Sequence, residues 1–369
     1  MKKDYDFLIV GSGLFGAVFA QEAIKHGQKV LVLERRPQVG GNLACQNKDG
    51  IWLHSYGAHI FHTNSQIVWN YVNQFTEFYP YIHTPLANYH GELYNLPFNM
   101  HTFYQLWGTK TAKQAKQKIA QQKSVATPQN LEEYALTIVG EELYRKLIQG
   151  YTEKQWGRTC KDLPASILKR IPLRFRYDNN YFDSLYQGIP TNSYNVLIEK
   201  LLAGSTILLN TDFLNQKEKY LSMAHRVLYT GAIDAYFNYR YGALAYRSLR
   251  FVSARIAQEN YQGVAVMNFT DRETPYTRII EHKHFSKNPS QPVTWITKEY
   301  PLTWTKDQEP YYPINDKENQ TLYEKYKQLA QQEPNVLFGG RLGEYHYYNM
   351  DQIVEAALHL AHSQLKAKQ

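Results

Sequence analysis

The chain has 369 residues, 43% hydrophobic and 20% charged, with a formal net charge of +8 and only two cysteines. This length predicts two or three domains, and the composition is that of a soluble globular protein. No apolar run approaches the roughly 18–20 residues of a membrane span, and no secretory leader precedes the first strand, so we expect a cytoplasmic protein without membrane insertion. The basic residues are spread along the chain, which argues against a nucleic-acid partner. Two cysteines alone make neither a disulfide framework nor a metal site.

The N-terminal forty residues carry the most informative pattern. An apolar strand, a helix and a second strand are expected within residues 7–33, and a Gly-x-Gly-x-x-Gly motif joins the first two at Gly11, Gly13 and Gly16. These glycines allow a tight turn, the approach of a pyrophosphate and close packing of helix on strand. Glu34 follows at the distance of the acid that binds ribose hydroxyls. The combination predicts a dinucleotide site, with a chance glycine-rich turn as the alternative.

The residues after the second strand favour FAD over NAD. The pair Glu34–Arg35 leads into a second glycine turn at Gly40–Gly41, an arrangement that resembles FAD enzymes of the glutathione-reductase and amine-oxidase type. The second turn would let the backbone pass close to the flavin. The alternative interpretation is a plain Pro/Gly connector.

The middle of the chain predicts a helical insertion. Apolar residues recur at helical spacing over 98–165, and Asn130 and Glu133 have the spacing of a capping box. After it, prolines interrupt a segment with three arginines, so we expect a mobile basic loop over 165–178. Guanidinium groups there could bind a diphosphate, although a solvated charge run is the alternative. A turn is expected over 187–191.

The remaining segments predict the fold class. Strand-like runs follow one another from 247 to 281, and a hairpin with a turn at His90–Gly91 is expected over 81–95. We therefore predict an α/β protein with a Rossmann-like FAD-binding domain, a helical insertion domain and an antiparallel β-sheet domain. Their expected limits are 1–80, 190–235 and 330–369 for the first, 98–180 for the second, and 81–97 with 236–329 for the third.

Two histidines follow the predicted FAD turns, at His59 and His62. A metal pair would need a third ligand at suitable spacing, and none is present. We therefore expect no metal. Beside a flavin, the two rings could donate a hydrogen bond or stack, and a structural role is the alternative for each.

Longer motifs resemble one family, the bacterial UDP-galactopyranose mutases, over essentially the whole chain. The N-terminal glycine motif and the segment 339–343 are shared by many flavoproteins, whereas the other motifs are more specific. The motifs are 11–16, 56–63, 150–157, 180–182, 246–251, 268–271, 276–285 and 339–343.

This resemblance implies an isomerase. Reduced FAD would interconvert UDP-α-D-galactopyranose and UDP-α-D-galactofuranose through a covalent flavin N5–galactose adduct with UDP as the leaving group. The furanose would supply surface glycan biosynthesis. The resemblance also implies a homodimer, and a reductant that is NADH, NADPH or an unknown donor.

The resemblance assigns roles residue by residue. Arg170 and Arg278 look like diphosphate clamps, Tyr151 like a platform for uracil, and His62 like part of the sugar and flavin pocket. The expected catalytic residues are Arg170, Arg278 and His62. The expected substrate-binding residues are Phe103, Gln105, Tyr151, Thr152, Trp156, Arg170, Arg174, Tyr181, Asn268, Arg278, Tyr311 and Tyr347. The expected cofactor-binding residues are Gly11, Gly13, Leu14, Phe15, Gly16, Glu34, Arg35, Gly41, Asn42, His59, Ile60, Asp212, Phe213, Thr230, Gly231, Arg247, Gly340, Arg341, Tyr347, Asn349, Met350 and Asp351.

Two positions depart from the family pattern, and two other functions remain open. Asn349 stands where some members have aspartate, and His346 where relatives often have arginine. One alternative function is an ordinary FAD oxidase or dehydrogenase of amine-oxidase architecture. The other is a nucleotide-sugar binder in which FAD is only structural.

Overall fold

A five-stranded parallel sheet forms the first part of the protein in the computed structural model, which describes residues 3–122, 127–168 and 172–365. Its strands lie in the order β10-β2-β1-β11-β17. Strands β1 and β2 are apolar runs buried from both sides, as expected of a parallel sheet that helices cover on both faces. The bounds are β1 Tyr5–Val10, β2 Val30–Leu33, β10 Thr206–Leu208, β11 Ala224–Tyr229 and β17 Val336–Phe338.

Helices α1 (Leu14–Lys25), α8 (Tyr194–Leu201) and α13 (Met350–Gln364) pack together against this sheet in one apolar core. Gly27 ends α1 with a φ of +71°, a backbone conformation that favours glycine. Segments far apart in the sequence thus build one domain, and the predicted Rossmann-like fold is confirmed.

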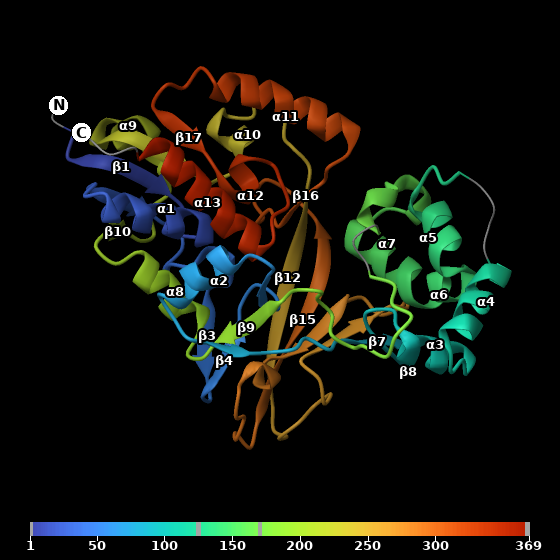
Figure 1. Cartoon of the computed structure of the whole chain (residues 1–369). Helices are drawn as coiled ribbons and strands as arrows, with labels where there is room; N and C mark the ends of the chain where they lie inside the picture. Colours follow the sequence, from blue (N-terminus) through green and yellow to red (C-terminus); the bar gives the residue numbers. More distant parts are fainter. Residues whose placement is uncertain (1–2, 123–126, 169–171, 366–369) are drawn as a thin grey trace.

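A seven-stranded sheet stands between this domain and a group of helices (Figure 1). Its order is β16-β12-β15-β14-β13-β7-β8, and the long strands β12 and β15 pair along ten residues each. The predicted antiparallel sheet is confirmed, and one of its pairings is parallel, that of β7 with β13. The hairpin β7–β8 comes from a distant part of the chain, so no tight turn fixes its direction against β13. The bounds are β7 Leu86–Tyr89, β8 Glu92–Asn95, β12 Tyr246–Ile256, β13 Val266–Phe269, β14 Arg278–Glu281, β15 Thr294–Thr303 and β16 Tyr312–Pro313.

The predicted helical insertion is confirmed between β8 and β9. Asn130 caps α5 by accepting from the backbone N–H of Glu133 at 2.9 Å, whereas the Glu133 carboxylate accepts from Gln129 and does not complete the box. The bounds are α3 Met100–Trp107, α4 Ala112–Gln122, α5 Leu131–Val139, α6 Glu141–Leu143, η2 Tyr144–Gln149 and α7 Gly150–Trp156.

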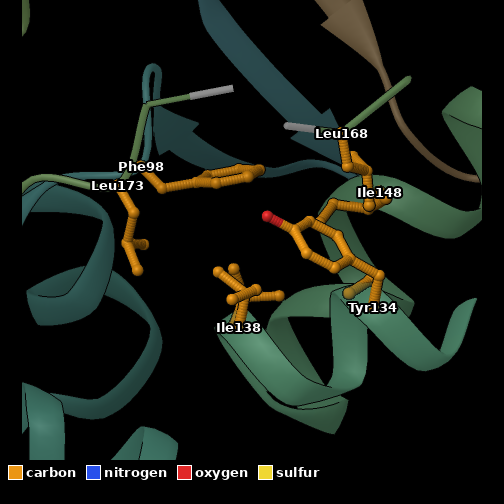
Figure 2. Close-up of a pocket in the computed structure, with 8 residues that line it drawn as sticks. Phe98, Tyr134, Ile138, Ile148, Leu168 and Leu173 are labelled. Atoms are coloured by element: carbon orange, nitrogen blue, oxygen red, sulfur yellow. The ribbon is translucent and has the colours of Figure 1, made fainter. Parts of the chain in front are cut away.

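A small apolar cavity of about 50 Å³ lies inside the helical domain. Figure 2 shows Phe98, Ile138 and Leu168 around it, with the Tyr134 hydroxyl directed into the space. Such a lining offers no charged group to a nucleotide sugar, so we assign it to core packing.

The turn expected over 187–191 is corrected, because these residues belong largely to strand β9 (Tyr186–Pro190), which pairs with β5 and β6. A Cβ on Gly188 would lie 2.7 Å from the Tyr79 carbonyl oxygen. Glycine at position 188 therefore allows the strands to pack closely, and it does not form a turn. The remaining bounds are β3 Cys45–Lys48, β4 Ile51–His54, β5 Phe61–Thr63, β6 Phe78–Pro80, α2 Gln66–Asn73, α9 Lys217–Met223, α10 Ile233–Tyr236, α11 Lys317–Ala330, α12 Gly340–Gly343, η1 Gly41–Leu43, η3 Cys160–Asp162, η4 Ala165–Ile167, η5 Phe213–Gln216 and η6 His282–Phe285.

Within the described part of the chain, no helix combines the length and the apolar character that a membrane crossing needs.

Candidate functional site

The N-terminal glycines form a cradle between β1 and α1. Gly11 has a φ of +100°, and a Cβ there would lie 2.3 Å from the Thr230 hydroxyl. A Cβ on Gly16 would lie 2.2 Å from the Gly11 carbonyl oxygen, which is why helix and strand can pack so closely. Around Gly13 the space within 4 Å of a Cβ is open. The N-terminus of α1 therefore faces room for a phosphate.

Glu34 is buried at the end of β2. One carboxylate oxygen accepts from the backbone N–H and hydroxyl of Ser12 at 3.1 and 2.5 Å, and the other accepts from the Arg36 backbone at 2.9 Å. The Arg36 guanidinium lies 4.4 Å from the ring centroid of Tyr56, and its Nη1 is buried without a hydrogen-bond partner among the described residues. A buried carboxylate and an unsatisfied guanidinium nitrogen fit the ribose and phosphate of a dinucleotide.

The C-terminal segment brings further polar groups to the same domain. Gly340 begins α12 with a φ of +77°, and Arg341 donates to the Tyr348 carbonyl at 2.8 Å while lying over the Tyr347 ring. Asn349 caps α13, its backbone N–H donating to Gln352 at 2.9 Å. Another atom without a partner in the described chain is buried here, the Oδ1 of Asp351.

A chain of buried histidines fixes the backbone at His59. Its N–H donates to Nδ1 of His54 at 3.1 Å, and the His54 N–H donates to Nδ1 of His282 at 3.2 Å. The Tyr194 hydroxyl donates to the His59 carbonyl at 3.2 Å. Burial, together with the nearby Arg341 charge, lowers the pKa of His59 to about 4. The His59 ring is therefore neutral near pH 7, and the His59 backbone is held by hydrogen bonds at its N–H and its carbonyl.

Arg278, the first residue of β14, is the centre of a second polar cluster. Its Nη2 donates to the Tyr151 hydroxyl at 2.9 Å, and its Nε lies 3.2 Å from Glu299 Oε1. Asn268 stands opposite it in the register of β13 and β14. Although burial lowers the pKa of Arg278, Glu299 and the surrounding tyrosines raise it above the ordinary value. A fixed cation with phenolic neighbours suits a diphosphate.

Tyr312 connects this cluster with the C-terminal segment. Its pKa is raised, first by burial and then by the charges of Glu299 and the phenol of Tyr347, while Arg278 and Arg341 act against the increase. The rings of Tyr312 and Tyr347 lie 5.9 Å apart. The proposed sites for diphosphate and cofactor are therefore neighbours.

His62 faces the same region from β5. Its ring stacks on Phe182 with centroids 3.8 Å apart, and Nδ1 is 3.1 Å from the Ser184 hydroxyl. Burial lowers the pKa of His62, and the Asp351 carboxylate partly opposes that decrease. Tyr181 lies beyond it, edge-on to His83 at 5.6 Å.

Other predicted residues are placed elsewhere. Phe103 has 0% exposure and stacks on Trp107 and Phe175, so we correct its assignment from substrate contact to core residue. Gln105 is exposed and pairs with Asn95. Phe213 is likewise enclosed by the tyrosines of its own core cluster, which leaves only its backbone for a cofactor.

The arginines differ in what they can still bind. Arg174 is buried and pairs with Asp183 at 2.7 Å, so its charge is already compensated. Arg247 donates to the Gln155 carbonyl at 2.8 Å and thereby holds the C-terminus of α7. Arg170 lies outside the described residues, and its role stays a prediction.

The sequence did not single out Glu299, Tyr312, His83 or Arg36. Glu299 sits in an ordinary alternating strand, so only its pairing with Arg278 reveals it. Tyr312 could have been noticed beside Tyr311. Arg36 adjoins the predicted pair Glu34–Arg35.

Two sequence models of known protein families match the chain. The sequence model of UDP-galactopyranose mutase matches residues 146–347, and that of an NAD(P)-binding Rossmann-like domain matches residues 9–75. The chain belongs to the UDP-galactopyranose mutase family. Members of this family are isomerases, and the predicted enzyme class is confirmed.

Three relatives of the mutase family align along nearly the whole chain. A protein named probable UDP-galactopyranose mutase from Klebsiella pneumoniae is 41% identical, over 96% of this chain and 94% of its own. A dTDP-fucopyranose mutase from Escherichia coli is 38% identical, over 97% and 98%. The UDP-galactopyranose mutase of Mycoplasma genitalium is 32% identical, over 95% and 92%.

Solved structures support the fold. A reduced UDP-galactopyranose mutase superposes with a TM-score of 0.73 at 14% identity, covering 98% of this chain and 95% of that one. A variant putrescine oxidase superposes with a TM-score of 0.54 at 12% identity, covering 98% and 99%. At these identities the likeness concerns architecture alone.

Proposed function

We propose that the protein interconverts UDP-galactopyranose and UDP-galactofuranose with FAD as its cofactor. The observation that carries the proposal is the cluster of Arg278, Tyr151 and Glu299 next to a dinucleotide cradle. A paired guanidinium and phenol suit the diphosphate of a nucleotide sugar. The relatives named for this reaction support the choice of sugar.

The cofactor assignment rests on the cradle and its orphaned polar atoms. Gly13 leaves room for the pyrophosphate, Glu34 would take the ribose, and Asp351 and His59 would lie toward the flavin. Reduced FAD would supply a nucleophilic N5 for the anomeric carbon of the sugar. The reduced state and the reductant stay predictions.

The protein's own side chains would bind the nucleotide sugar and orient it. Arg278 stays charged throughout, so it can stabilise the negative charge that develops on departing UDP. Tyr151 accepts a hydrogen bond from it and is thereby directed to the same place. Neutral His62 and His59 would fill the sugar side without repelling a cationic sugar carbon.

A second substrate has support from one relative. The Escherichia coli dTDP-fucopyranose mutase is nearly as similar to this chain as the Klebsiella relative, at 38% against 41% identity. Its name implies a thymine base and a 6-deoxy sugar. The same reaction on dTDP-fucose is therefore the alternative.

The test is a chromatographic turnover assay on the purified flavoprotein. UDP-galactofuranose and dTDP-fucofuranose would each be incubated with the oxidised and the dithionite-reduced enzyme. We expect conversion of the UDP sugar to the pyranose only after reduction. Faster conversion of the dTDP sugar would favour the alternative, and no conversion of either would reject a mutase.

The biological setting remains part of the proposal. We infer a role in supplying galactofuranose for surface glycans, in the cytoplasm and as a homodimer. Sedimentation of the holoenzyme would test the dimer.

A further inference from the structure

The ammonium group of Lys154 sits in a site made of three backbone carbonyls. Nζ donates to Phe269 and Thr274 at 2.9 Å each, and to Tyr276 at 3.2 Å. An ammonium has three protons to donate and no capacity to accept. Its three donors are therefore matched one to one by Phe269, the last residue of β13, and by two residues of the loop 270–277, which joins β13 to β14.

This contact joins the two elements that carry the diphosphate cluster. Tyr151 lies three residues before Lys154 on α7, on the same side of the helix. Arg278 comes two residues after Tyr276, where β14 begins. One side chain thus ties the helix of Tyr151 to the loop that leads into the strand of Arg278.

The loop is pressed against α7 along its length. A Cβ on Gly150 would lie 2.4 Å from the Thr270 carbonyl oxygen, so the two backbones touch at the start of the helix. The backbone N–H of Thr274 donates to the buried carboxylate of Asp271 at 2.6 Å, which shapes the loop from within. Lys154 contacts the chain at both ends of this loop, at Phe269 and at Tyr276.

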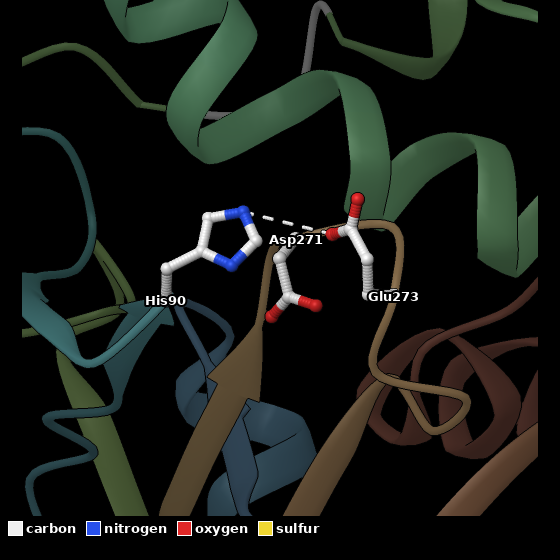
Figure 3. Close-up of side chains that lie close together, drawn as sticks. All are labelled: His90, Asp271 and Glu273. Carbon is white, nitrogen blue, oxygen red and sulfur yellow. Dashed lines mark ion pairs between the residues drawn. The ribbon is translucent and has the colours of Figure 1, made fainter.

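Charge on the loop complements the ammonium. Burial lowers the pKa of Lys154 to about 8, and the carboxylates of Asp271 and Glu273 oppose that decrease, so the side chain stays largely charged near pH 7. Figure 3 shows these two side chains beside His90, which pairs with Glu273 at 3.6 Å. Among the described residues, these three are the one group whose possible ligand atoms lie close enough together to hold a metal ion, but the carboxylates of Asp271 and Glu273 also interact electrostatically with Lys154.

We propose that Lys154 is a positioning residue for nucleotide-sugar binding. Its ammonium fixes α7 relative to the loop, so that Tyr151 and Arg278 hold their 2.9 Å hydrogen bond and face one diphosphate. This inference rests on the proposed function. Without the ammonium, three carbonyls lose their donor and the loop before Arg278 is free to shift.

Lys154→Met is the variant that tests it, and Lys146→Met is a matched control. Lys146 also joins the helical domain to the same sheet, donating to Glu92 and Tyr94 at 2.8 and 3.2 Å, but on β8, away from Arg278. We expect Lys154→Met to weaken UDP binding to the holoenzyme by about tenfold or more, a change of about 1.4 kcal/mol. Lys146→Met should stay within about twofold, since partly exposed ion pairs contribute little.

Lys154→Arg separates charge from shape. It should recover part of the UDP affinity, because the guanidinium still donates to carbonyls. Flavin content should be unchanged in all three variants. Equal UDP affinity in Lys154→Met and Lys146→Met would overturn the proposal, as would an arginine variant no better than the methionine one.

Hydrogen exchange keeps this test separate from the proposed activity. Amides of residues 270–277 should exchange faster in Lys154→Met than in wild type, and not in Lys146→Met. If exchange is faster in Lys154→Met but the wild-type enzyme turns over neither nucleotide sugar, the proposed mutase function is rejected, whereas the contact of Lys154 with the loop 270–277 is supported. If exchange is unchanged in Lys154→Met and the wild-type enzyme turns over its substrate, only the positioning role of Lys154 is rejected.

Discussion

Arg278 and Glu299 form an ion pair across neighbouring antiparallel strands, with 3.2 Å between Nε and Oε1. The Glu299 carboxylate is almost wholly buried, and burial raises its pKa although Arg278 opposes that shift. The pair orients the guanidinium so that Nη2 reaches Tyr151. The Arg278 guanidinium, which would bind the diphosphate, is therefore itself oriented by the buried carboxylate of Glu299.

Replacement of Arg278 tests the centre of this cluster. Arg278→Ala should lower kcat/KM by about 10²–10³-fold or more, the effect typical of losing one group that stabilises developing charge. Flavin absorbance should be intact, because Arg278 is not part of the glycine cradle. Turnover close to wild type would remove Arg278 from the diphosphate site.

Replacement of Glu299 tests the buried ion-pair partner of Arg278. Glu299→Gln keeps the shape but removes the charge, so Arg278 loses its orientation and we expect kcat/KM to fall about tenfold. Stability should drop by about 1–3 kcal/mol, the cost of an unsatisfied buried group. Glu309→Gln is the control, since Glu309 pairs with Arg36 at 3.1 Å in a more exposed place and should cost at most about 1 kcal/mol. Equal effects of the two substitutions on turnover would contradict the role of Glu299.

Glu34 should decide whether the flavin stays bound. In Glu34→Gln, an amide N–H₂ would face the donors Ser12 and Arg36, which now point at carboxylate oxygens. We expect the purified variant to lose most of its flavin, measured by absorbance per protein. Glu22→Gln on α1, which breaks an ion pair with Lys25 of 2.9 Å, should keep the flavin. Full flavin content in Glu34→Gln would place the ribose elsewhere.

The sequence predicted what depends on local pattern. Gly11 and Gly16 lie within one strand–helix–strand unit and allow the tight turn and close packing that their spacing predicted. The binding of ribose by Glu34 stays a prediction. Glu299 was missed because its importance comes from register with Arg278, which no local pattern encodes. The turn expected at Gly188 was wrong for a related reason, since distant strands on both sides turn a glycine-containing segment into a strand.

The residues of the candidate site also differ in whether the sequence alone could identify them. Family motifs led to Arg278 and Tyr151, which the structure brings together. Phe103 was assigned from the family resemblance, which does not say which side of α3 is buried in this chain. Lys154 lies inside a recognised motif, yet its three carbonyl partners come from the end of β13 and the loop after it, more than a hundred residues later.

Acid should destabilise the protein through its buried histidines. Burial lowers the pKa of His282 and of His83 to about 3, from an ordinary value near 6.5. Between pH 6.5 and 3 the unfolded chain therefore binds protons at these histidines, whereas the folded chain does not. The stability that comes from burying the neutral rings is present above pH 6.5 and is lost as pH falls toward 3. Melting temperatures of the apoprotein between pH 7 and 4 should fall steeply.

A histidine variant gives the control for this pH dependence. His282→Asn can keep an acceptor for the His54 N–H and removes one titrating group. Its melting temperature should be lower at pH 7 but should change less between pH 7 and 4. An unchanged slope would show that His282 does not set the acid limit.

Asn349 tests whether the departure from the family pattern matters. It caps α13, and aspartate caps helices as well as asparagine does. Because a negative charge at a helix N-terminus is favourable by about 0.3–1 kcal/mol, Asn349→Asp should raise the melting temperature slightly. Turnover should stay within about threefold, since amide and carboxylate share an acceptor oxygen. A tenfold loss of flavin or of kcat/KM would show that the Asn349 amide donates its own hydrogen bond to a bound group, which a carboxylate cannot do.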